Sequence, residues 1–508
     1  MPLLNAVNDQ NPRQIAWEVL RQRHAGGSFA EDLLERALAK TRLSPVDRAL
    51  CQELVYGVVR WQVALDWLIG RKTDQREQKP GLQNLLRLGL YQIFWLDRIP
   101  DHAAVHETVE LAKRNGFGAQ AGLMNAILRG YLREQDEAGK LLADLKISRP
   151  ALGWSHPEWL VARWRQRWGA EKTALLLAWN NTPPKTFARV NTLKFCSSRR
   201  EEALISKSEI SQSLLTSAAT SELRDAGDLL AQWREEDVEY DFVRRDWLEE
   251  NLVFELKSHP PLAALESFRR GWFYVQDPGT LLAPGELKPR PGETILDFCA
   301  APGGKTTFIA QLMRDEGKIV AGDIFEDRLK LLRENCVRLG VTCVETVMND
   351  WNRPHPDPHP QEREQQSSAR KISSDARLAD QPPAIPPRPA GEGRGEGGRI
   401  FDRILVDAPC SNTGVMRRRV DLRWRIRPEE ILRLQQTQLV LLEQAASRLK
   451  PGGVLVYSTC SLEPEENQEV VKEFLREHKD FKLESERELL PFWDGVDGAF
   501  VARLKRLP

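Results

Sequence analysis

Apolar residues recur every three or four positions through the first third of the chain, which is the spacing of one face of a helix. The pattern is clear at Ile15, Val19, Leu20, Leu33, Leu34, Ala37, Leu38, Leu54, Val55, Val58 and Val59. Ser44 followed by Pro45 is a typical helix start, an N-cap with proline in the first turn. Residues 85–94 are apolar on nearly every side, which predicts the central helix of a bundle. We therefore predict an all-helical domain over residues 1–148.

Short apolar runs alternate with helical patterns from residue 292 onward. Strands are predicted at 294–298, 318–324, 341–347, 402–407 and 453–458, and a last strand at 498–504 is expected at the sheet edge. Helices are predicted between strands, for example over 328–339 and 429–449. This alternation is typical of a parallel, doubly wound sheet. Residues 291–508 are therefore predicted to form a Rossmann-like α/β domain.

The remaining segments carry weaker signals. Residues 149–290 combine a helical pattern at 154–168 with a strand pattern at 186–191, and we predict a linker and a small α+β middle domain there. Residues 354–398 are rich in Pro, Gly, Arg, Gln, Ser and Glu, so burial cannot offset their ordering entropy. We predict a disordered loop between the third and fourth strands. Its mixed charges favour a tolerated insertion over a basic RNA tether.

Composition narrows the class of protein. The 508 residues have a formal net charge of zero, so any nucleic-acid surface must be local. No apolar run reaches the length of a membrane span, and the N-terminus lacks a signal-peptide core. Seven cysteines without a secretory signal predict reduced thiols and a cytoplasmic location. The absence of a C-x-x-C pair or a His/Cys cluster at zinc spacing predicts that the protein binds no metal.

Two cysteines follow two of the predicted strands. Cys410 comes after the apolar run 404–406, and Cys460 comes after the run 454–456. Ligands of an open α/β sheet bind just beyond the carboxyl ends of its strands. We therefore expect both thiols in one site, and the pair suggests an enzyme with a nucleophilic cysteine.

A glycine-rich turn, Cys299-Ala-Ala-Pro-Gly-Gly-Lys305, follows the first strand of the same sheet. Its glycines permit close backbone approach to a ligand, and the next helix presents free N–H groups. The spacing matches neither the dinucleotide fingerprint nor a Walker loop. Asp323 and Asp350 follow the next two strands, where acids bind ribose hydroxyls or an adenine amine. Taken singly, each acid could be a turn or cap residue, but in this order they suit S-adenosylmethionine.

These motifs match a known family. Asp297-x-Cys-Ala-Ala-Pro-Gly-Gly-Lys305, Asp407-Ala-Pro-Cys-Ser411 and Ser458-Thr-Cys-Ser461 together resemble the RNA cytosine-C5 methyltransferases. Residues 16–20 and 55–60 resemble the NusB-type RNA-binding domain. The combination resembles the bacterial Sun/RsmB group, which modifies 16S ribosomal RNA. The resemblance covers nearly the whole chain except 354–398 and parts of 197–250.

The resemblance implies roles for the site residues. Adding a thiolate to C6 of cytosine makes C5 able to attack a sulfonium methyl group, and the C5 proton and the thiol must then leave. The family likeness makes Cys460 the nucleophile and Cys410 the residue that assists product release. Asp407 would hold the base edge near N3 and N4, and Lys305 would lie near the cofactor or the cysteines, where a cation lowers a thiol pKa. The residues alone do not rank the two cysteines, which could also be inert core thiols.

The expected cofactor, S-adenosyl-L-methionine, would contact a larger set of residues. These are Cys299, Ala300, Ala301, Pro302, Gly303, Gly304, Lys305, Asp323, Arg328, Asp350 and Asp407. Arg328 is equally well explained as a solvated helix arginine. Four other cysteines are expected to be inert core thiols: Cys51, Cys196, Cys336 and Cys343.

RNA must reach the site with its target base unstacked. The basic segments 416–419 and 423–427 follow Cys410 directly, and we expect them to contact RNA rather than to form a solvated helix face. The strand at 187–191 resembles one in the family's RNA-facing middle domain, so we expect RNA recognition within 149–290. Asn412 replaces the glycine common in the family after Cys-Ser, which affects loop stiffness or base entry without removing a catalytic group.

The resemblance therefore implies methyl transfer to C5 of a specific cytosine in 16S rRNA, the cytosine-967 type of the family. The expected partner is 16S rRNA, naked or in an assembly intermediate, and a monomer without metal or membrane attachment is expected. One alternative is a tRNA cytosine-C5 methyltransferase, which the NusB-like domain disfavours. Another is a non-catalytic RNA-binding assembly factor, which the presence of Cys460 and Asp407 argues against.

Overall fold

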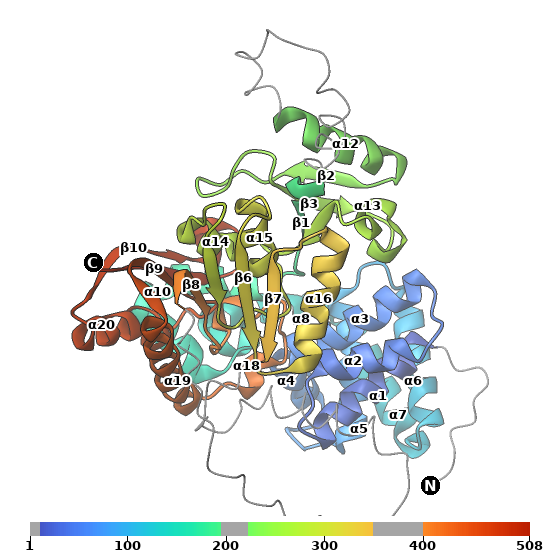
Figure 1. Ribbon diagram of the computed structural model, residues 1–508. Coiled ribbons are helices and arrows are strands. Elements are labelled where there is room, and N and C mark those ends of the chain that lie inside the picture. Colours follow the sequence, from blue (N-terminus) through green and yellow to red (C-terminus); the bar gives the residue numbers. More distant parts are fainter. Residues whose placement is uncertain (1–10, 195–221, 349–399) are drawn as a thin grey trace, which may run out of the picture. The chain divides into compact units, whose positions relative to one another are not determined.

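The computed structural model describes residues 11–194, 222–348 and 400–508. These residues form two compact units. Figure 1 shows their helices and strands. The described part of the first is 11–182 with 416–425, and the second contains the rest. Cys196, Asp350 and the predicted insert 354–398 lie outside the described residues. None of the described helices combines the length and apolar character that a membrane crossing requires.

The first unit is all-helical. Its helices are α1 (Pro12–Ala25), α2 (Ala30–Ala39), α3 (Pro45–Arg60), α4 (Gln62–Lys72), α5 (Pro80–Trp95), α6 (Asp101–Arg114), η1 (Gly118–Gln120), α7 (Ala121–Arg133), α8 (Gln135–Ser148), α9 (Pro150–Gly153), α10 (Glu158–Asn180) and α18 (Leu422–Arg425). The predicted N-cap Ser44 accepts a hydrogen bond from the backbone N–H of Asp47. The predicted all-helical N-terminal domain is confirmed, and this compact unit continues past the predicted boundary at residue 148.

Helix α5 is buried on most of its surface, as its uniform apolar pattern predicts. Helix α3 packs against it at a glycine. A Cβ atom on Gly57 would lie 1.9 Å from the ring carbon Cζ of Tyr91, so only glycine allows this close approach. The Tyr91 hydroxyl of α5 donates a hydrogen bond to Oε1 of Glu53, which lies on α3 like Gly57, at 2.5 Å.

The segment 416–425 packs within the helical unit, which corrects part of the RNA prediction. Arg417 and Arg423 are 1% and 0% exposed, and the guanidinium of Arg417 lies 4.0 Å from the ring centroid of Trp179. The indole N–H of Trp424 donates to the carbonyl of Val59 at 2.8 Å. Arg417 and Arg423 therefore hold the segment in place and do not face RNA, whereas Arg419 is exposed.

The predicted middle region 149–290 is divided at residue 182, and its part in the second unit contains a four-stranded antiparallel sheet in the order β2-β3-β1-β4. Its strands are β1 (Thr186–Val190), β2 (Glu239–Phe242), β3 (Val253–Ser258) and β4 (Phe273–Val275), and its helices are α12 (Glu222–Glu235), η2 (Leu262–Ala264) and α13 (Glu266–Arg269). Trp233 of α12 is fully buried, with its ring centroid 5.5 Å from those of Phe254 and Phe273. The predicted strand at 186–191 and the α+β character are confirmed.

The C-terminal domain is a seven-stranded sheet in the order β10-β11-β9-β8-β5-β6-β7, parallel from β9 to β7. Its strands are β5 (Thr294–Asp297), β6 (Lys318–Asp323), β7 (Val344–Met348), β8 (Phe401–Asp407), β9 (Leu449–Thr459), β10 (Phe481–Leu489) and β11 (Ala499–Arg506). Its helices are η3 (Pro278–Leu281), α14 (Leu282–Leu287), α15 (Gly304–Leu312), α16 (Glu326–Leu339), η4 (Thr413–Val415), α19 (Pro428–Ser447), η5 (Pro464–Glu466), α20 (Gln468–Glu477) and α21 (Pro491–Asp494). The predicted doubly wound α/β domain is confirmed.

Helices cover both faces of this sheet, which explains its apolar strands. Ile295 packs with α14, α15 and α16, whereas its neighbour Leu296 packs with α19 and α20 on the opposite face. Figure 1 shows α16 beside β7. One prediction is wrong: the strand β11 lies inside the sheet, between β9 and β10. The edge strand β10 was missed because its sequence, FKLESEREL, is largely charged, as suits an exposed edge.

Candidate active site

The two predicted cysteines lie together. Strands β8 and β9 are parallel neighbours, with Asp407 opposite Ser458 in register, so the residues that follow them share one edge of the sheet. The Sγ atoms of Cys410 and Cys460 are 3.3 Å apart. Cys410 is 4% exposed, and Cys460 is partly exposed. Both thiols therefore belong to one site just beyond the carboxyl ends of adjacent strands.

Asn412 contacts both cysteines. Its backbone φ of 58° lies in the left-handed region, which asparagine tolerates better than most residues. Its side-chain Nδ2 donates to the carbonyl of Cys410 at 2.7 Å, and its Oδ1 accepts from the thiol of Cys460 at 2.9 Å. Asparagine thus preserves a glycine-like backbone and adds a polar contact to a thiol.

The thiol of Cys410 is held protonated. Its contact with Cys460 and its burial raise its pKa well above the ordinary value. A thiol with a raised pKa is a poor nucleophile in its neutral form, and its thiolate is a strong base.

A lysine and an aspartate form an ion pair in the same part of the sheet. Lys305 Nζ lies 2.7 Å from Asp407 Oδ2, and Ser458 Oγ donates to Asp407 Oδ1 at 2.8 Å. Burial lowers the pKa of Lys305, but the charges of Asp407 and then Cys460 outweigh it, so the pKa is raised overall. Lys305 therefore stays cationic, and its interaction with Cys460 places a positive charge near that sulfur.

The glycine-rich turn carries the chain from β5 into α15. Gly303 has φ 102°, and a Cβ atom there would lie 3.0 Å from Leu332 Cγ, so a side chain would strain the turn. The turn is anchored to the neighbouring strand, because the backbone N–H of Ala300 donates to the carbonyl of Gly322 at 2.9 Å. Ala301 is buried, and Pro302 is exposed. The turn is thus fixed in shape while its outer part faces solvent.

Asp323 ends β6, directly beside this turn. Its carboxylate Oδ2 lies 3.4 Å from Arg328 Nη1, and Arg328 Nη2 donates to the carbonyl of Ala301 at 2.7 Å. Burial raises the pKa of Asp323, partly offset by the charge of Arg328. Burial also raises the pKa of Cys299 well above its ordinary value, which fits a packing role. The structure brings Asp323 and Arg328 to the turn, whereas Asp350 lies outside the described residues.

The sequence reading missed several buried polar residues near the site. Asp297 is fully buried at the end of β5, accepts from Thr306 Oγ at 2.7 Å, and has its pKa raised to about 7 by burial. Arg189 of β1 donates to the carbonyl of Gly304 at 2.9 Å, and so links the middle sheet to the turn. Glu466, at the end of η5, is fully buried although it lies in an acidic run. Only the position of Asp297 at a strand end offered a signal.

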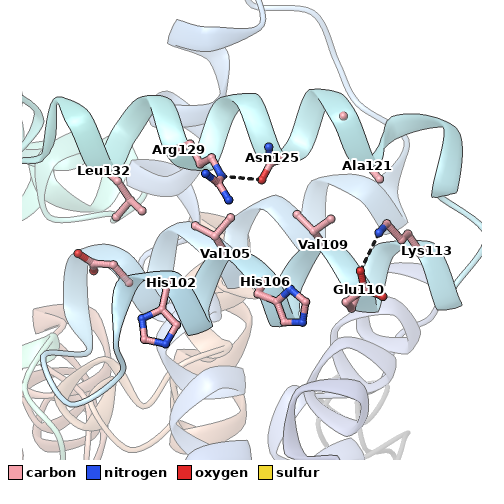
Figure 2. A pocket seen from close by; sticks show the side chains of 12 residues that line it. His102, Val105, His106, Val109, Glu110, Lys113, Ala121, Asn125, Arg129 and Leu132 are labelled. Atoms are coloured by element: carbon pink, nitrogen blue, oxygen red, sulfur yellow. Dashed lines mark hydrogen bonds and ion pairs between the residues drawn. The ribbon is translucent and has the colours of Figure 1, made fainter.

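A separate groove of about 700 Å³ lies between α6 and α7 in the helical unit. Figure 2 shows Val105 and Val109 projecting from α6 toward α7. The polar residues that line the groove carry charges of both signs: Lys113 is paired with Glu110, and Arg129 donates a hydrogen bond to the neutral Asn125. None of the predicted site residues lines this groove.

A doubly wound domain with a glycine-rich turn, an acid at the next strand end and two adjacent thiols defines a class of cofactor-dependent transferase. Three family models match the chain: "16S rRNA methyltransferase RsmB/F" over residues 285–365 and 391–505, the NusB family over 10–133, and the RsmF/B-like ferredoxin-like domain over 156–208.

Individual relatives match nearly the full length of the chain. The probable ribosomal RNA small subunit methyltransferase B of Synechocystis is 35% identical over 97% of this chain and 99% of the relative. The Bacillus subtilis protein of the same name is 33% identical over 97% and 98%. Ribosomal RNA small subunit methyltransferase B of Escherichia coli O1:K1 is 33% identical over 97% and 98%. The chain belongs to the RsmB family of 16S rRNA methyltransferases, with a NusB domain at its N-terminus.

The crystal structure of PH0851 has the same fold, with a TM-score of 0.67 and 23% sequence identity over 98% of this chain and 100% of that chain. The family's ferredoxin-like domain model matches residues 156–208, a range that includes α10 and the strand β1 of the middle sheet.

Proposed function

We propose that this RsmB-type enzyme transfers a methyl group from S-adenosyl-L-methionine to C5 of one cytosine of 16S rRNA, the cytosine-967 type, through a covalent bond between Cys460 and C6. The observation that carries the proposal is the pair of sulfurs, 3.3 Å apart, beside the ion pair of Lys305 and Asp407. An inert structural pair of thiols would not need an ion pair beside it.

The residues at the sheet edge fit the proposed cofactor. Asp297 Oδ1 is buried and unpaired among the described residues, and the carboxylate of Asp323 lies at the next strand end, where acids bind ribose hydroxyls. The backbone of the turn through Gly303 and Gly304 would contact the remainder of the cofactor. The bound cofactor would supply an electrophilic methyl group. Cys299, Arg328 and Asp350 stay predicted contacts.

The thiolate of Cys460 would form a bond to C6 of the unstacked base, which places electron density on C5. Lys305, paired with Asp407, would hold a positive charge near the reacting sulfur. Asp407, already fixed by Lys305 and Ser458, would accept from the amino edge of the base. Once C5 carries the methyl group, Cys410, after releasing its own proton to solvent, would accept the proton from C5 as a thiolate. The C5–H electron pair would re-form the C5–C6 double bond, and Cys460 would leave C6 as a thiolate.

Bisulfite mapping of RNA from cells that lack the protein tests this proposal. We expect one cytosine of 16S rRNA to lose its protection from conversion, and a plasmid copy of the gene to restore it. Purified protein with labelled S-adenosylmethionine should then methylate 16S rRNA, and the comparison of naked RNA with 30S particles identifies the substrate form. Loss of protection in tRNA alone would replace the proposal by a tRNA methyltransferase. A cytoplasmic location and a monomeric state stay predictions.

A further inference from the structure

A buried carboxylate, Glu466, contacts the loops of both cysteines. It ends η5 and is 0% exposed. Its Oε1 accepts from the backbone N–H of Ser411 at 2.8 Å, and its Oε2 accepts from the hydroxyl of Ser411 and from that of Ser461. Ser411 directly follows Cys410, and Ser461 directly follows Cys460. One side chain therefore fixes the residue next to each sulfur.

The same network holds the other side of Cys410. Gln438 of α19 donates from one amide nitrogen to Glu466 Oε1 at 3.1 Å and to the carbonyl of Pro409 at 2.9 Å. Pro409 precedes Cys410, and Ser411 follows it. The backbone on both sides of this cysteine is thus tied to the pair formed by Glu466 and Gln438.

The two loops also bond directly to each other. The hydroxyls of Ser411 and Ser461 are 3.0 Å apart. The backbone N–H of Gly414 donates to the carbonyl of Cys460 at 2.9 Å. Asn467, next to Glu466, donates to the carbonyl of Ser461 at 2.9 Å. The first two contacts depend on the two loops keeping one relative position, the third fixes the Cys460 loop itself, and the carboxylate of Glu466 lies at the junction of the loops.

Burying a carboxyl group costs free energy, so a purely structural role would be filled as well by a neutral side chain. A carboxylate offers something that a neutral group does not: two oxygens with four lone pairs that can accept from both loops at once. Burial raises the pKa of Glu466 to about 7, and the hydrogen bonds from Ser411 and Ser461 oppose that rise. Four donors use these lone pairs: the backbone N–H and the hydroxyl of Ser411, the hydroxyl of Ser461 and the amide of Gln438.

We propose that Glu466 is a positioning residue that sets the relative placement of the two active-site thiols by accepting hydrogen bonds from both cysteine loops. The proposal rests on the proposed function for its catalytic consequence, but the placement itself can be measured without RNA or cofactor. A change at Glu466 should loosen both loops and leave the strands that carry them intact.

Amide hydrogen exchange of the full chain tests the placement. Glu466→Ala and Glu466→Gln are compared with Glu469→Gln, a control at an exposed glutamate at the start of α20. We expect exchange to rise about tenfold in peptides covering 408–415 and 459–463 for Glu466→Ala, less for Glu466→Gln, and not for the control. Exchange confined to residues 463–468, or unchanged exchange in both loops, overturns the proposal. If Glu466→Ala does not fold, the same criteria apply to Glu466→Gln.

Kinetics separate positioning from a merely structural role. Small displacements of reacting groups can cost on the order of 100-fold in rate. We expect Glu466→Gln to lower kcat ten- to 100-fold, with the KM for RNA and the Kd for S-adenosylmethionine within twofold of wild type. Looser loops with an unchanged kcat would overturn the proposal. If wild type itself fails to methylate RNA, the proposed function fails, and hydrogen exchange alone decides the role of Glu466.

Discussion

Two cations, the buried Arg423 and the part-buried Lys305, show how differently the two units use charge. In the helical unit, Arg423 donates to Asn181 Oδ1 at 2.7 Å and to the carbonyl of Asn180 at 2.9 Å, which are both neutral. In the second unit, Lys305 lies 2.7 Å from a carboxylate, that of Asp407. Burial and the neighbouring Arg60 lower the pKa of Arg423, whereas Asp407 raises that of Lys305 against its burial.

The difference indicates two roles for these cations, one in folding and one in chemistry. Arg423 satisfies backbone and amide oxygens that would otherwise be buried without donors, which is a folding role. The ion pair of Lys305 and Asp407 lies at the strand ends beside two sulfurs, where a fixed charge can act on chemistry. We therefore expect variants at the sheet edge to lose activity with the fold intact, and variants around Arg423 to lose stability with activity retained.

The largest effect is expected for Cys460→Ala. Removing the proposed nucleophile should reduce methyl transfer below detection, while the Kd for S-adenosylmethionine and the thermal midpoint stay near wild type, because a small, partly exposed side chain is lost. Labelled methyl transfer and calorimetry measure the two properties. Cys336→Ala, which removes a buried thiol from α16, is the control and should stay active. Full activity of Cys460→Ala would remove the basis for assigning chemistry to this sheet edge.

Cys410→Ala is expected to stop turnover at a later step. In the proposed mechanism Cys460 can still bond to the base, but the group proposed to accept the C5 proton is missing. Denaturing gels should therefore show protein linked covalently to RNA, in an amount that requires S-adenosylmethionine. The double variant Cys410→Ala with Cys460→Ala should show no such band. A linked species that survives in the double variant would contradict the roles given to the two sulfurs.

A smaller loss is expected for Lys305→Met. The substitution keeps the length of the side chain and removes the cation, so Asp407 loses its ion-pair partner and Cys460 loses a nearby positive charge. We expect kcat to fall about 100-fold, because Asp407 is no longer held in place and small displacements of reacting groups can cost that much in rate. Lys330→Met, at an exposed lysine of α16, should have no effect. An unchanged kcat would show that Lys305 acts only in packing.

How much could be foreseen from sequence depended on the range of the interactions. Short apolar runs predicted the parallel strands, and the cysteine motifs at their ends predicted that the sulfurs would meet, because both signals lie within a few residues. The contacts of Glu466 join residues 55 positions apart, and those of Arg423 with Asn181 join residues 242 apart. Such contacts leave no local pattern. The basic segment around Arg423 was therefore expected to contact RNA, although Arg423 is buried. Nothing in the sequence around Glu466 indicated that this acid is buried.

The smallest effect on activity is expected for Arg423→Met, which tests the other half of the comparison. Asn181 Oδ1 and the carbonyl of Asn180 would lose their donor, at a cost of about 1–3 kcal/mol for each unsatisfied group. Relief of the buried charge beside Arg60 offsets part of that cost, so we expect the free energy of unfolding to fall by about 2 kcal/mol. The specific activity of the folded protein at low temperature should stay within twofold of wild type. Chemical denaturation measures the first quantity, and Arg419→Met, at an exposed arginine of the same segment, is the control. If Arg423→Met instead lost activity with its stability intact, the segment 416–425 would take part in catalysis or RNA binding, and the division between folding charges and chemical charges would not hold.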